Sequence, residues 1–335
     1  MSPTAVTPDL SVVIPVYNED ANLDALYREL TETLAASGHT YEIILVDDGS
    51  QDRSFERLAA IQAADPRVRV IQFRKNFGQT AAFAAGFAAA RGRLIVTSDG
   101  DLQNDPRDIA GMVDRLERED VDIVCGWRKD RKDAWINRRL PSVIANRLIS
   151  WATGVRLNDY GCSLKVFRSE VVKPLRLYGE LHRFLPALAS EMGVRIAEQP
   201  VNHRPRVAGR SKYGISRTIR VMLDLVTVKF LLSYSTRPLQ MFGLIGGVMG
   251  GVGITILGYL GFMRLTQAHY PLTDRLPLVM FGILLGFTGV QLVTVGLLAE
   301  MQARTYHESQ GKPVYVIRRV LDAEKRAEPR NGLLP

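Results

Sequence analysis

The stretch that decides the fold is Arg93-Leu-Ile-Val-Thr-Ser98 followed by Asp99-Gly-Asp-Leu-Gln-Asn-Asp105. The first part is short, apolar at its centre and rich in β-branched residues, which is typical of a buried strand. The second part is acidic and is followed by Pro106, a residue favoured at the first position of a helix. The stretch therefore predicts a strand that ends in an acidic loop and continues into a helix over residues 106–117.

The same order of strand and helix is repeated on both sides of this stretch. The sequence predicts strands over residues 10–15, 41–47, 68–73, 93–98 and 121–127, and helices over 22–36, 53–64, 80–90 and 106–117. Such alternation predicts an open, mostly parallel α/β sheet. Ligands of such sheets bind beyond the carboxyl ends of the strands.

Three acidic loops follow strands of this predicted sheet. They are Pro15-Val-Tyr-Asn-Glu19, Val46-Asp-Asp-Gly-Ser-Gln-Asp52 and Ser98-Asp-Gly-Asp-Leu-Gln-Asn-Asp105. A single Asp after a strand is usually a helix cap or a turn former, and this explains Asp52 and Asp105. It does not explain three acidic loops at one edge of a sheet.

The acidic loops indicate a divalent cation bound together with a phosphate-bearing substrate. Asp99 and Asp101 are alternate residues, and Mg²⁺ is commonly held by one or two carboxylates plus substrate phosphates. The sequence has no Walker-A motif and no Gly-x-Gly-x-x-Gly after the first strand. Phosphate must then be held by metal and by cationic side chains, for which the candidates are Arg128, Arg138, Arg139, Arg206, Arg210 and Lys212.

Composition narrows the class of protein. The chain has 335 residues, of which 46% are hydrophobic and 23% charged, which excludes a disordered or fibrous protein. The net charge of +8 suggests a polyanionic partner: nucleic acid, an anionic membrane surface or a phosphate-bearing substrate. Cys125 and Cys162 are too few for a disulfide scaffold, and we expect both to be buried apolar residues. Residues 1–9 contain no apolar run, so we expect no secretory signal.

The composition changes after Pro238. Residues 241–263 and 276–299 are two runs without a charged residue, and each is long enough to cross a bilayer. They are joined by a short polar connector over residues 264–275, and we interpret them as a transmembrane hairpin. Residues 215–235 carry Arg217, Arg220 and Asp224 at helical spacing, which favours an amphipathic helix at the membrane surface over an ordinary packed helix.

Flanking charges predict the orientation of the hairpin. Lys229, Arg237, Arg304, Lys312, Arg318 and Arg319 lie on one side, whereas the connector has only Arg264 and Arg275. The positive-inside rule then places both chain ends in the cytoplasm. Gly243, Gly247 and Gly251, and also Gly246 and Gly250, are four residues apart. This spacing permits close helix packing, although glycine is generally frequent in membrane helices.

Six motifs carry a resemblance to a known family. They are Val12-Val-Ile-Pro-Val-Tyr-Asn-Glu19, Val46-Asp-Asp-Gly-Ser50, Asn76-Phe-Gly-Gln79, Asp99-Gly-Asp-Leu-Gln103, Asp159-Tyr-Gly-Cys-Ser-Leu-Lys165 and Gly209-Arg-Ser-Lys-Tyr213. The sequence resembles the family 2 glycosyltransferases of GT-A fold. Among them it is similar to the polyprenyl-phosphate glycosyltransferases, which include dolichyl-phosphate mannose synthases and bactoprenol glucosyltransferases. It looks closest to undecaprenyl-phosphate 4-deoxy-4-formamidoarabinose transferases. The usual middle residue of the metal motif is alanine, and here it is Gly100.

The resemblance implies a role for individual residues. Pro15, Tyr17, Glu19, Val46 and Asp48 would hold the nucleoside of a nucleotide sugar, and Asp99, Gly100 and Asp101 its ribose and diphosphate. Asp101 and Gln103 would bind Mg²⁺ or Mn²⁺, and Arg128, Arg206 and Lys212 would neutralise the diphosphate. Arg138 and Ser142 would hold the acceptor phosphate, and Asp159 would lie near the reacting centre.

We therefore expect four segments: a GT-A, Rossmann-like α/β domain over 1–213, an amphipathic interface helix over 214–238, a transmembrane hairpin over 239–301 and a cytoplasmic tail over 302–335. The expected activity is inverting transfer of a sugar, with uridine diphosphate as the leaving group, to a polyprenyl phosphate in the cytoplasmic leaflet of the inner membrane. The product would serve cell-envelope glycan or lipid A modification. We expect no nucleic-acid partner and, by the resemblance, a homo-oligomer such as a tetramer.

Three other functions compete with this interpretation. A GDP-mannose-dependent polyprenyl-phosphate mannose synthase would use the same motifs. A processive polysaccharide synthase would need a larger membrane bundle and a Gln-x-x-Arg-Trp motif, which the sequence lacks. A nucleotide-binding membrane scaffold without catalysis is the third, and the intact set of Asp99, Asp101 and Gln103 argues against it.

Overall fold

The computed structural model describes residues 7–129, 149–150, 153–177, 181–204, 238–267, 271–309 and 315–323. The chain divides into two compact units. The first contains residues 1–228 and 313–335, and the second contains residues 229–312. The first unit is therefore discontinuous in the sequence, because the second is inserted before its last segment.

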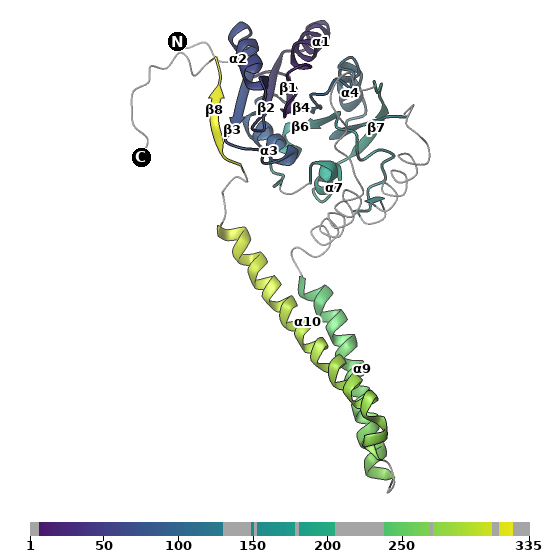
Figure 1. The fold of residues 1–335 in the computed structure, drawn as a ribbon. Coiled ribbons are helices and arrows are strands. Elements are labelled where there is room, and N and C mark those ends of the chain that lie inside the picture. Colours follow the sequence, from purple (N-terminus) through teal and green to yellow (C-terminus); the bar gives the residue numbers. More distant parts are fainter. Residues whose placement is uncertain are drawn as a thin grey trace. The chain divides into compact units, whose positions relative to one another are not determined.

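The first unit is built on an eight-stranded sheet with the strand order β7-β5-β6-β4-β1-β2-β3-β8 (Figure 1). The strands are β1 (Leu10–Val16), β2 (Tyr41–Asp47), β3 (Val68–Phe73), β4 (Leu94–Thr97), β5 (Ile123–Trp127), β6 (Lys165–Arg168), β7 (Ile196–Pro200) and β8 (Ile317–Leu321). The helices of this unit are α1 (Leu23–Ala36), α2 (Ser54–Ala64), α3 (Gln79–Ala89), α4 (Asp108–Arg118), α6 (Ser169–Val172), η2 (Leu181–Phe184) and α7 (Leu185–Ser190).

The predicted α/β sheet is confirmed, with more antiparallel pairing than we expected. β4, β1, β2 and β3 run parallel to one another, as strand–helix alternation predicts. β6 lies between β4 and β5 and is antiparallel to both. β6 and β8 lie outside the strand–helix alternation that the sequence shows over residues 10–127, so the alternation did not indicate their pairing.

Both faces of the sheet are covered, which explains why its central strands are continuous apolar runs. Helices α1, α2 and α4 lie on one face, and α3 and α7 on the other (Figure 1). Val12 belongs to a core shared with the leucines of α1 and with α4. The next side chain, Val13, points to α3, where Gly86 has no Cβ and lets the helix approach.

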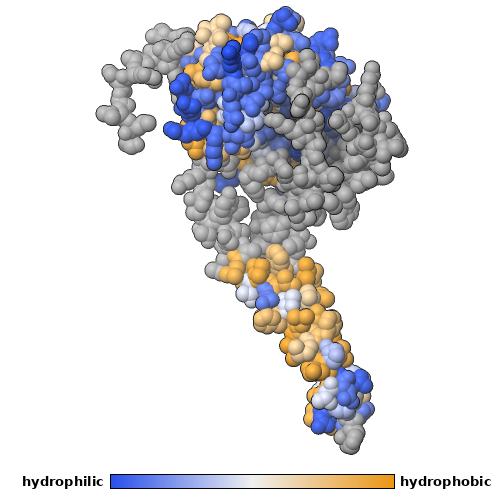
Figure 2. Space-filling view, in the orientation of Figure 1, coloured by the Kyte–Doolittle hydropathy of each residue, from blue (hydrophilic) through white to orange (hydrophobic). Residues whose placement is uncertain are grey.

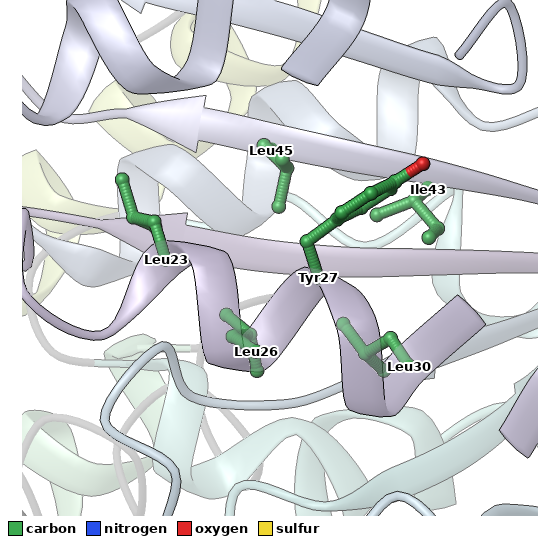
Figure 3. Close-up of a pocket in the computed structure, with 6 residues that line it drawn as sticks. All are labelled: Leu23, Leu26, Tyr27, Leu30, Ile43 and Leu45. Carbon is green, nitrogen blue, oxygen red and sulfur yellow. The ribbon is translucent and has the colours of Figure 1, made fainter. Parts of the chain in front are cut away.

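The packing of α1 on β2 is wholly apolar. Leu23, Leu26, Tyr27 and Leu30 of α1 face Ile43 and Leu45 of β2 (Figure 3). The Tyr27 hydroxyl leaves this seam and donates to Asp65 Oδ2 at 3.0 Å. Burial of each large aliphatic side chain in such a seam is worth about 1.5–3 kcal/mol, so the seam fixes α1 against the sheet.

The second unit is a helical hairpin of α9 (Pro238–Thr266), η3 (Leu272–Arg275) and α10 (Leu276–Ser309). Residues 242–266 and 272–298 are each long and apolar enough to cross a membrane, with mean hydropathies of 1.7 and 2.1. The apolar side chains point outward: Leu244 and Ile254 are each 71% exposed. Figure 2 shows the hydrophobic colour along most of this hairpin and the hydrophilic colour at its far end.

Glycines make the contact between the two helices. A Cβ on Gly246 would lie 2.6 Å from the backbone oxygen of Gly289, and one on Gly253 would lie 2.7 Å from that of Gly282. Within the part of the chain that the structure describes, a Cβ on Gly247 or Gly251 would meet nothing within 4 Å. The sequence did not distinguish these glycines, but the structure does: Gly246 packs against the other helix, whereas Gly247 and Gly251 do not among the described residues.

The C-terminal segment is more than a tail. α10 continues to Ser309, and residues 317–321 form β8, which pairs antiparallel with β3. The sequence analysis identified neither feature. The predicted amphipathic helix over 214–238 lies outside the described residues, apart from Pro238, where α9 begins.

Candidate active site

The loops after β1 and β2 are joined to each other at the carboxyl edge of the sheet. Asp48 N donates to Val16 O at 2.8 Å, and Asn18 N donates to Ser50 Oγ at 3.0 Å. Asn18 has a φ of 55°, in the left-handed region, and its side-chain oxygen accepts from Gln51 N at 2.8 Å. These bonds fix the segment that contains the half-buried Tyr17 and Glu19 beside the segment that contains Asp48.

Asp48 is buried and is held by the loop that follows β3. Its two carboxylate oxygens accept from Phe77 N at 2.7 Å and Gly78 N at 2.9 Å. Burial raises the pKa of Asp48 to about 6, although the two N–H donors act in the opposite direction. Gly49 has a φ of 69°, and a Cβ there would lie 2.5 Å from the carbonyl carbon of Lys75. The two loops therefore touch backbone to backbone.

The loop after β4 lies next to the loop after β1. A Cβ on Gly100 would lie 3.3 Å from Pro15 O and 3.9 Å from Glu19 Cγ. Because β4, β1 and β2 are parallel neighbours, the three acidic loops meet at one edge, as the sequence predicts. The predicted residues Pro15, Tyr17, Glu19, Val46 and Asp48 lie in or beside these loops.

Two residues that the sequence analysis did not assign hold Asp99. Gln79 Nε2, at the start of α3, donates to Asp99 Oδ1 at 2.6 Å. Ser163 Oγ donates to Asp99 Oδ2 at 2.7 Å. Loss of water around the carboxyl group raises the pKa of Asp99, and the charge of Asp101 raises it further. Both partners belong to motifs that carried the family resemblance, so the signal was present without an assigned role.

The oxygen atoms of this loop fit a hard divalent cation. Asp99 and Asp101 bring two carboxylates close enough for Asp101 to disfavour ionisation of Asp99, and a cation would relieve that repulsion. Asp101 Oδ1 accepts from Gln103 N at 3.2 Å, across a turn in which Leu102 has a φ of 61°. Gln103 therefore stands beside Asp101 and adds a neutral amide oxygen to the oxygen ligands that Mg²⁺ and Mn²⁺ prefer. In the described ranges no group of three His, Cys, Asp or Glu side chains forms a metal cluster, so such a cation would need substrate oxygens as well.

Arg128 and Asp159 form a buried ion pair at the end of β5. Arg128 Nε and Nη2 donate to the two oxygens of Asp159 at 2.7 and 2.8 Å, and the side chains are 11% and 6% exposed. Burial disfavours the charge on Arg128, but its hydrogen bonds to Asp159 and the charge of that carboxylate raise its pKa above the ordinary value. Gly161 N also donates to Asp159 at 3.1 Å. Asp159 therefore orients the guanidinium of Arg128 and stabilises the turn that follows Asp159.

The structural alternatives raised for other residues are confirmed. Asp52 forms the turn before α2, where it accepts from Ser54 N at 3.0 Å, and Asp105 accepts from Arg107 N at 3.1 Å. Cys125 and Cys162 are free and fully buried, and burial raises their thiol pKa values to about 12 and about 11. The predicted phosphate-binding residues Arg138, Ser142, Arg206 and Lys212 lie outside the described residues.

Comparison with known proteins identifies the family of the segment that contains this site. The model of the family described as "Glycosyl transferase family 2" matches residues 11–175, the segment that contains the three acidic loops, Arg128 and Asp159. The chain is 44% identical to a dodecaprenyl-phosphate galacturonate synthase of Rhizobium johnstonii, over 95% of both chains. It is 40% identical to an undecaprenyl-phosphate 4-deoxy-4-formamido-L-arabinose transferase of Shewanella sediminis, over 94% of this chain and 93% of the relative.

The chain belongs to glycosyltransferase family 2. It is a glycosyltransferase, and the comparisons support its membership of the polyprenyl-phosphate group within that family. The resemblance to the formamidoarabinose transferases is confirmed, but the galacturonate synthase shares more identity with the chain than they do.

Solved structures support the fold of this family 2 glycosyltransferase. A glucosyl-3-phosphoglycerate synthase of Mycobacterium tuberculosis, crystallised with Mn²⁺ and uridine-diphosphate-glucose, matches with a TM-score of 0.52 at 18% identity. The match covers 68% of this chain and 81% of that protein. At this identity the match shows a shared GT-A architecture and no more.

Proposed function

We propose that the chain transfers a sugar from a nucleotide sugar to a polyprenyl phosphate. The observation that carries this proposal is that the relatives agree on the acceptor and differ in the sugar. Dodecaprenyl phosphate and undecaprenyl phosphate are both polyprenyl phosphates, whereas galacturonate and formamidoarabinose are different sugars. A polyprenyl phosphate is therefore the acceptor class that these relatives support for this chain. As the leaving group we propose uridine diphosphate.

The described residues suit the donor. The loops around Tyr17, Glu19 and Asp48 would bind the nucleoside, as would the backbone at Pro15 and Val46. Asp99 and Gly100 would contact the ribose and diphosphate. Asp101 and Gln103 would hold Mg²⁺ or Mn²⁺, which neutralises charge on the departing diphosphate when bound. Arg128 would add a fixed positive charge at the same place.

The proposed transfer is a single inverting displacement. An oxygen of the lipid phosphate forms a bond to the anomeric carbon while the bond from that carbon to the nucleoside diphosphate breaks, and the electron pair leaves with the diphosphate. A phosphate monoester has a second pKa of about 6, so near neutral pH the acceptor is already mostly a dianion. No general base is needed, which agrees with an Asp159 whose two oxygens are occupied by Arg128 and Gly161. Arg138 and Ser142 would hold the acceptor phosphate, and Arg206 and Lys212 would assist Arg128.

Incubation of the full chain with undecaprenyl phosphate, Mg²⁺ and a panel of labelled nucleotide sugars tests this proposal. The panel contains UDP-galacturonate, UDP-formamidoarabinose, UDP-glucose and GDP-mannose. We expect one UDP-sugar to give a lipid-linked product by mass spectrometry. A product from GDP-mannose alone would favour a mannose synthase, and binding of nucleotides without any product would favour a scaffold.

We also propose that both ends of the hairpin face the cytoplasm, on the charge asymmetry of its flanks. The two native cysteines are buried, so engineered cysteines can be labelled against a low background. A Thr273→Cys variant in η3 should react with an impermeant thiol reagent only from the outer side of the membrane. Labelling of Thr273→Cys from the cytoplasmic side would reverse the orientation.

A further inference from the structure

Strand β8 is attached to the sheet at both of its ends. At the end far from the acidic loops, the buried carboxylate of Asp322 pairs with Arg69 Nε at 2.9 Å and Arg91 Nη2 at 3.1 Å. At the end near the loops, the ring of Tyr315 stacks on that of Phe73, with centroids 5.1 Å apart and planes at 14°. β8 therefore pairs with residues 70–73 of β3 and reaches the end of β3 from which the Asp48-binding loop starts.

The contact at Tyr315 continues into that loop. The Phe73 ring meets the Phe77 ring edge-on, with centroids 5.7 Å apart. Arg74 N donates to Val316 O at 3.0 Å, so the first residue of the loop is bonded to the backbone that leads into β8. The pairing of β8 with β3 is irregular between Gln72 and Phe73, where the register shifts. Such irregularities re-aim side chains at the ends of strands.

Residues 74–78 are in turn the support of Asp48. Phe77 N and Gly78 N donate to its two oxygens, and the backbone of Lys75 lies against Gly49. A contiguous series of contacts thus runs from Tyr315 to Phe73, to Phe77 and to Asp48. Asp48 is a residue that we propose binds the nucleoside of the donor.

We propose that Tyr315 is a positioning residue for the donor site: strand β8, which follows the membrane hairpin in the chain, fixes the loop 74–78 and thereby the carboxylate of Asp48. This inference rests on the proposed donor site. It assigns to the segment after the hairpin a role in nucleotide affinity, beyond covering the exposed edge of β3 against unwanted strand pairing.

A Tyr315→Ala variant of the full chain, purified in detergent with Mg²⁺, tests the inference. Because one aromatic pair contributes a modest increment, we expect the Kd for UDP and the KM for the donor to rise about two- to tenfold. We expect kcat and the KM for the lipid acceptor to stay within about twofold of wild type, since the contacts of this loop among the described residues include Asp48 and Gly49 of the proposed donor site. Tyr315→Phe keeps the ring and should restore wild-type affinity.

The matched control is Val316→Ala. Val316 is adjacent, its side chain is 49% exposed, and the backbone bond from Arg74 to Val316 O does not depend on its side chain. This variant should bind UDP as wild type does. Equal affinities of folded Tyr315→Ala and wild type would overturn the inference, and so would an equal loss in Val316→Ala.

Hydrogen exchange separates this inference from the proposed function. The amides of Phe77 and Gly78 should exchange faster in Tyr315→Ala than in wild type, while those of β1 should not change. If wild type bound no nucleotide, the proposed function would fail, but the exchange at Phe77 and Gly78 would still test the coupling. If Tyr315→Ala does not fold, Tyr315→Leu keeps apolar volume without an aromatic ring and should show a smaller change of the same sign.

Discussion

The two units of the molecule bury opposite kinds of residue. In the sheet unit the large apolar side chains are inside, and Val13 and Ile14 are fully buried. In the hairpin many large apolar side chains are exposed, such as Leu244 and Ile254, and Gly246 and Gly289 lie between the helices. The difference teaches that each interior is defined by its surroundings: water drives apolar groups inward, whereas in hydrocarbon only close backbone packing distinguishes inside from outside. The chemistry should therefore depend on the first unit, and access to a lipid acceptor on the second.

The largest expected effect is at the acidic loops. Asp101→Asn removes one charged ligand of the proposed cation, and turnover should fall at least about 100-fold, in the range seen when one transition-state stabiliser is removed. Chelation should abolish the activity of wild type, and Mg²⁺ or Mn²⁺ should restore it. Initial rates in the lipid-acceptor assay measure both effects.

The control for this prediction is Asp52→Asn. Asp52 is an exposed turn former beside the same sheet edge. The activity of the Asp52→Asn variant should therefore stay near that of wild type. Full activity of wild type in chelator would contradict the metal assignment.

A second effect should appear in stability as well as in rate. Arg128→Ala leaves the Asp159 carboxylate buried without its main partner, which typically costs about 3–5 kcal/mol. The melting temperature of the sheet unit should fall clearly. An Arg128→Met, Asp159→Asn double variant removes both charges and should recover much of the stability but not the activity. A double variant as unstable as the single one would show that the lost stability does not come from the unpaired charge.

A third effect should divide the glycines of the hairpin. Gly246→Leu places a side chain where the backbone oxygen of Gly289 lies, and overpacking of this kind costs about 1–3 kcal/mol. Gly247→Leu meets open space in the described chain and should leave the hairpin intact. Heat-induced aggregation in detergent compares the thermal stability of the two variants. If Gly247→Leu changes the oligomeric state, this second set of glycines packs against another copy of the chain.

The smallest expected effect concerns the pH dependence of the rate, whose acid limb should not shift. Asp159→Asn should lower the rate, because it loosens Arg128, but the acid limb of the pH–rate profile should stay near the second pKa of the lipid phosphate, about 6. Above that pH the acceptor is a dianion in both enzymes, and below it the rate should fall in both. A profile of kcat/KM for the acceptor checks this. Disappearance of the acid limb in Asp159→Asn would identify Asp159 as a general base.

The sequence predicted the parts of the fold that have a period. The strands at 10–15, 41–47, 68–73 and 121–127 and the helices between them lie within a few residues of the observed ones, because a buried parallel sheet imposes a strong apolar pattern. β8 was not predicted. Its residues Ile317–Leu321 contain two arginines, and its place in the sheet depends on pairing with a strand almost 250 residues earlier.

The candidate site was also predicted in part. The acidic residues were found because carboxylates after strands are conspicuous. Gln79 and Ser163 were missed as partners of Asp99, since a polar side chain that holds a carboxylate in place has no distinctive spacing. The pairing of Arg128 with Asp159 was also not predicted, because the resemblance placed Asp159 only near the reacting centre.

The position of β8 in the chain has a consequence for biosynthesis. During translation the strands β1 to β7 are made first, then both helices of the hairpin, and only afterwards the strand that covers the edge of β3. The nascent catalytic unit therefore exposes an unpaired strand edge for as long as the hairpin is being made, and exposed edges of this kind promote aggregation. The sheet of the enzyme can therefore be completed only after its hairpin has left the ribosome. The order of the segments in the sequence thus sets the order in which the two units can mature.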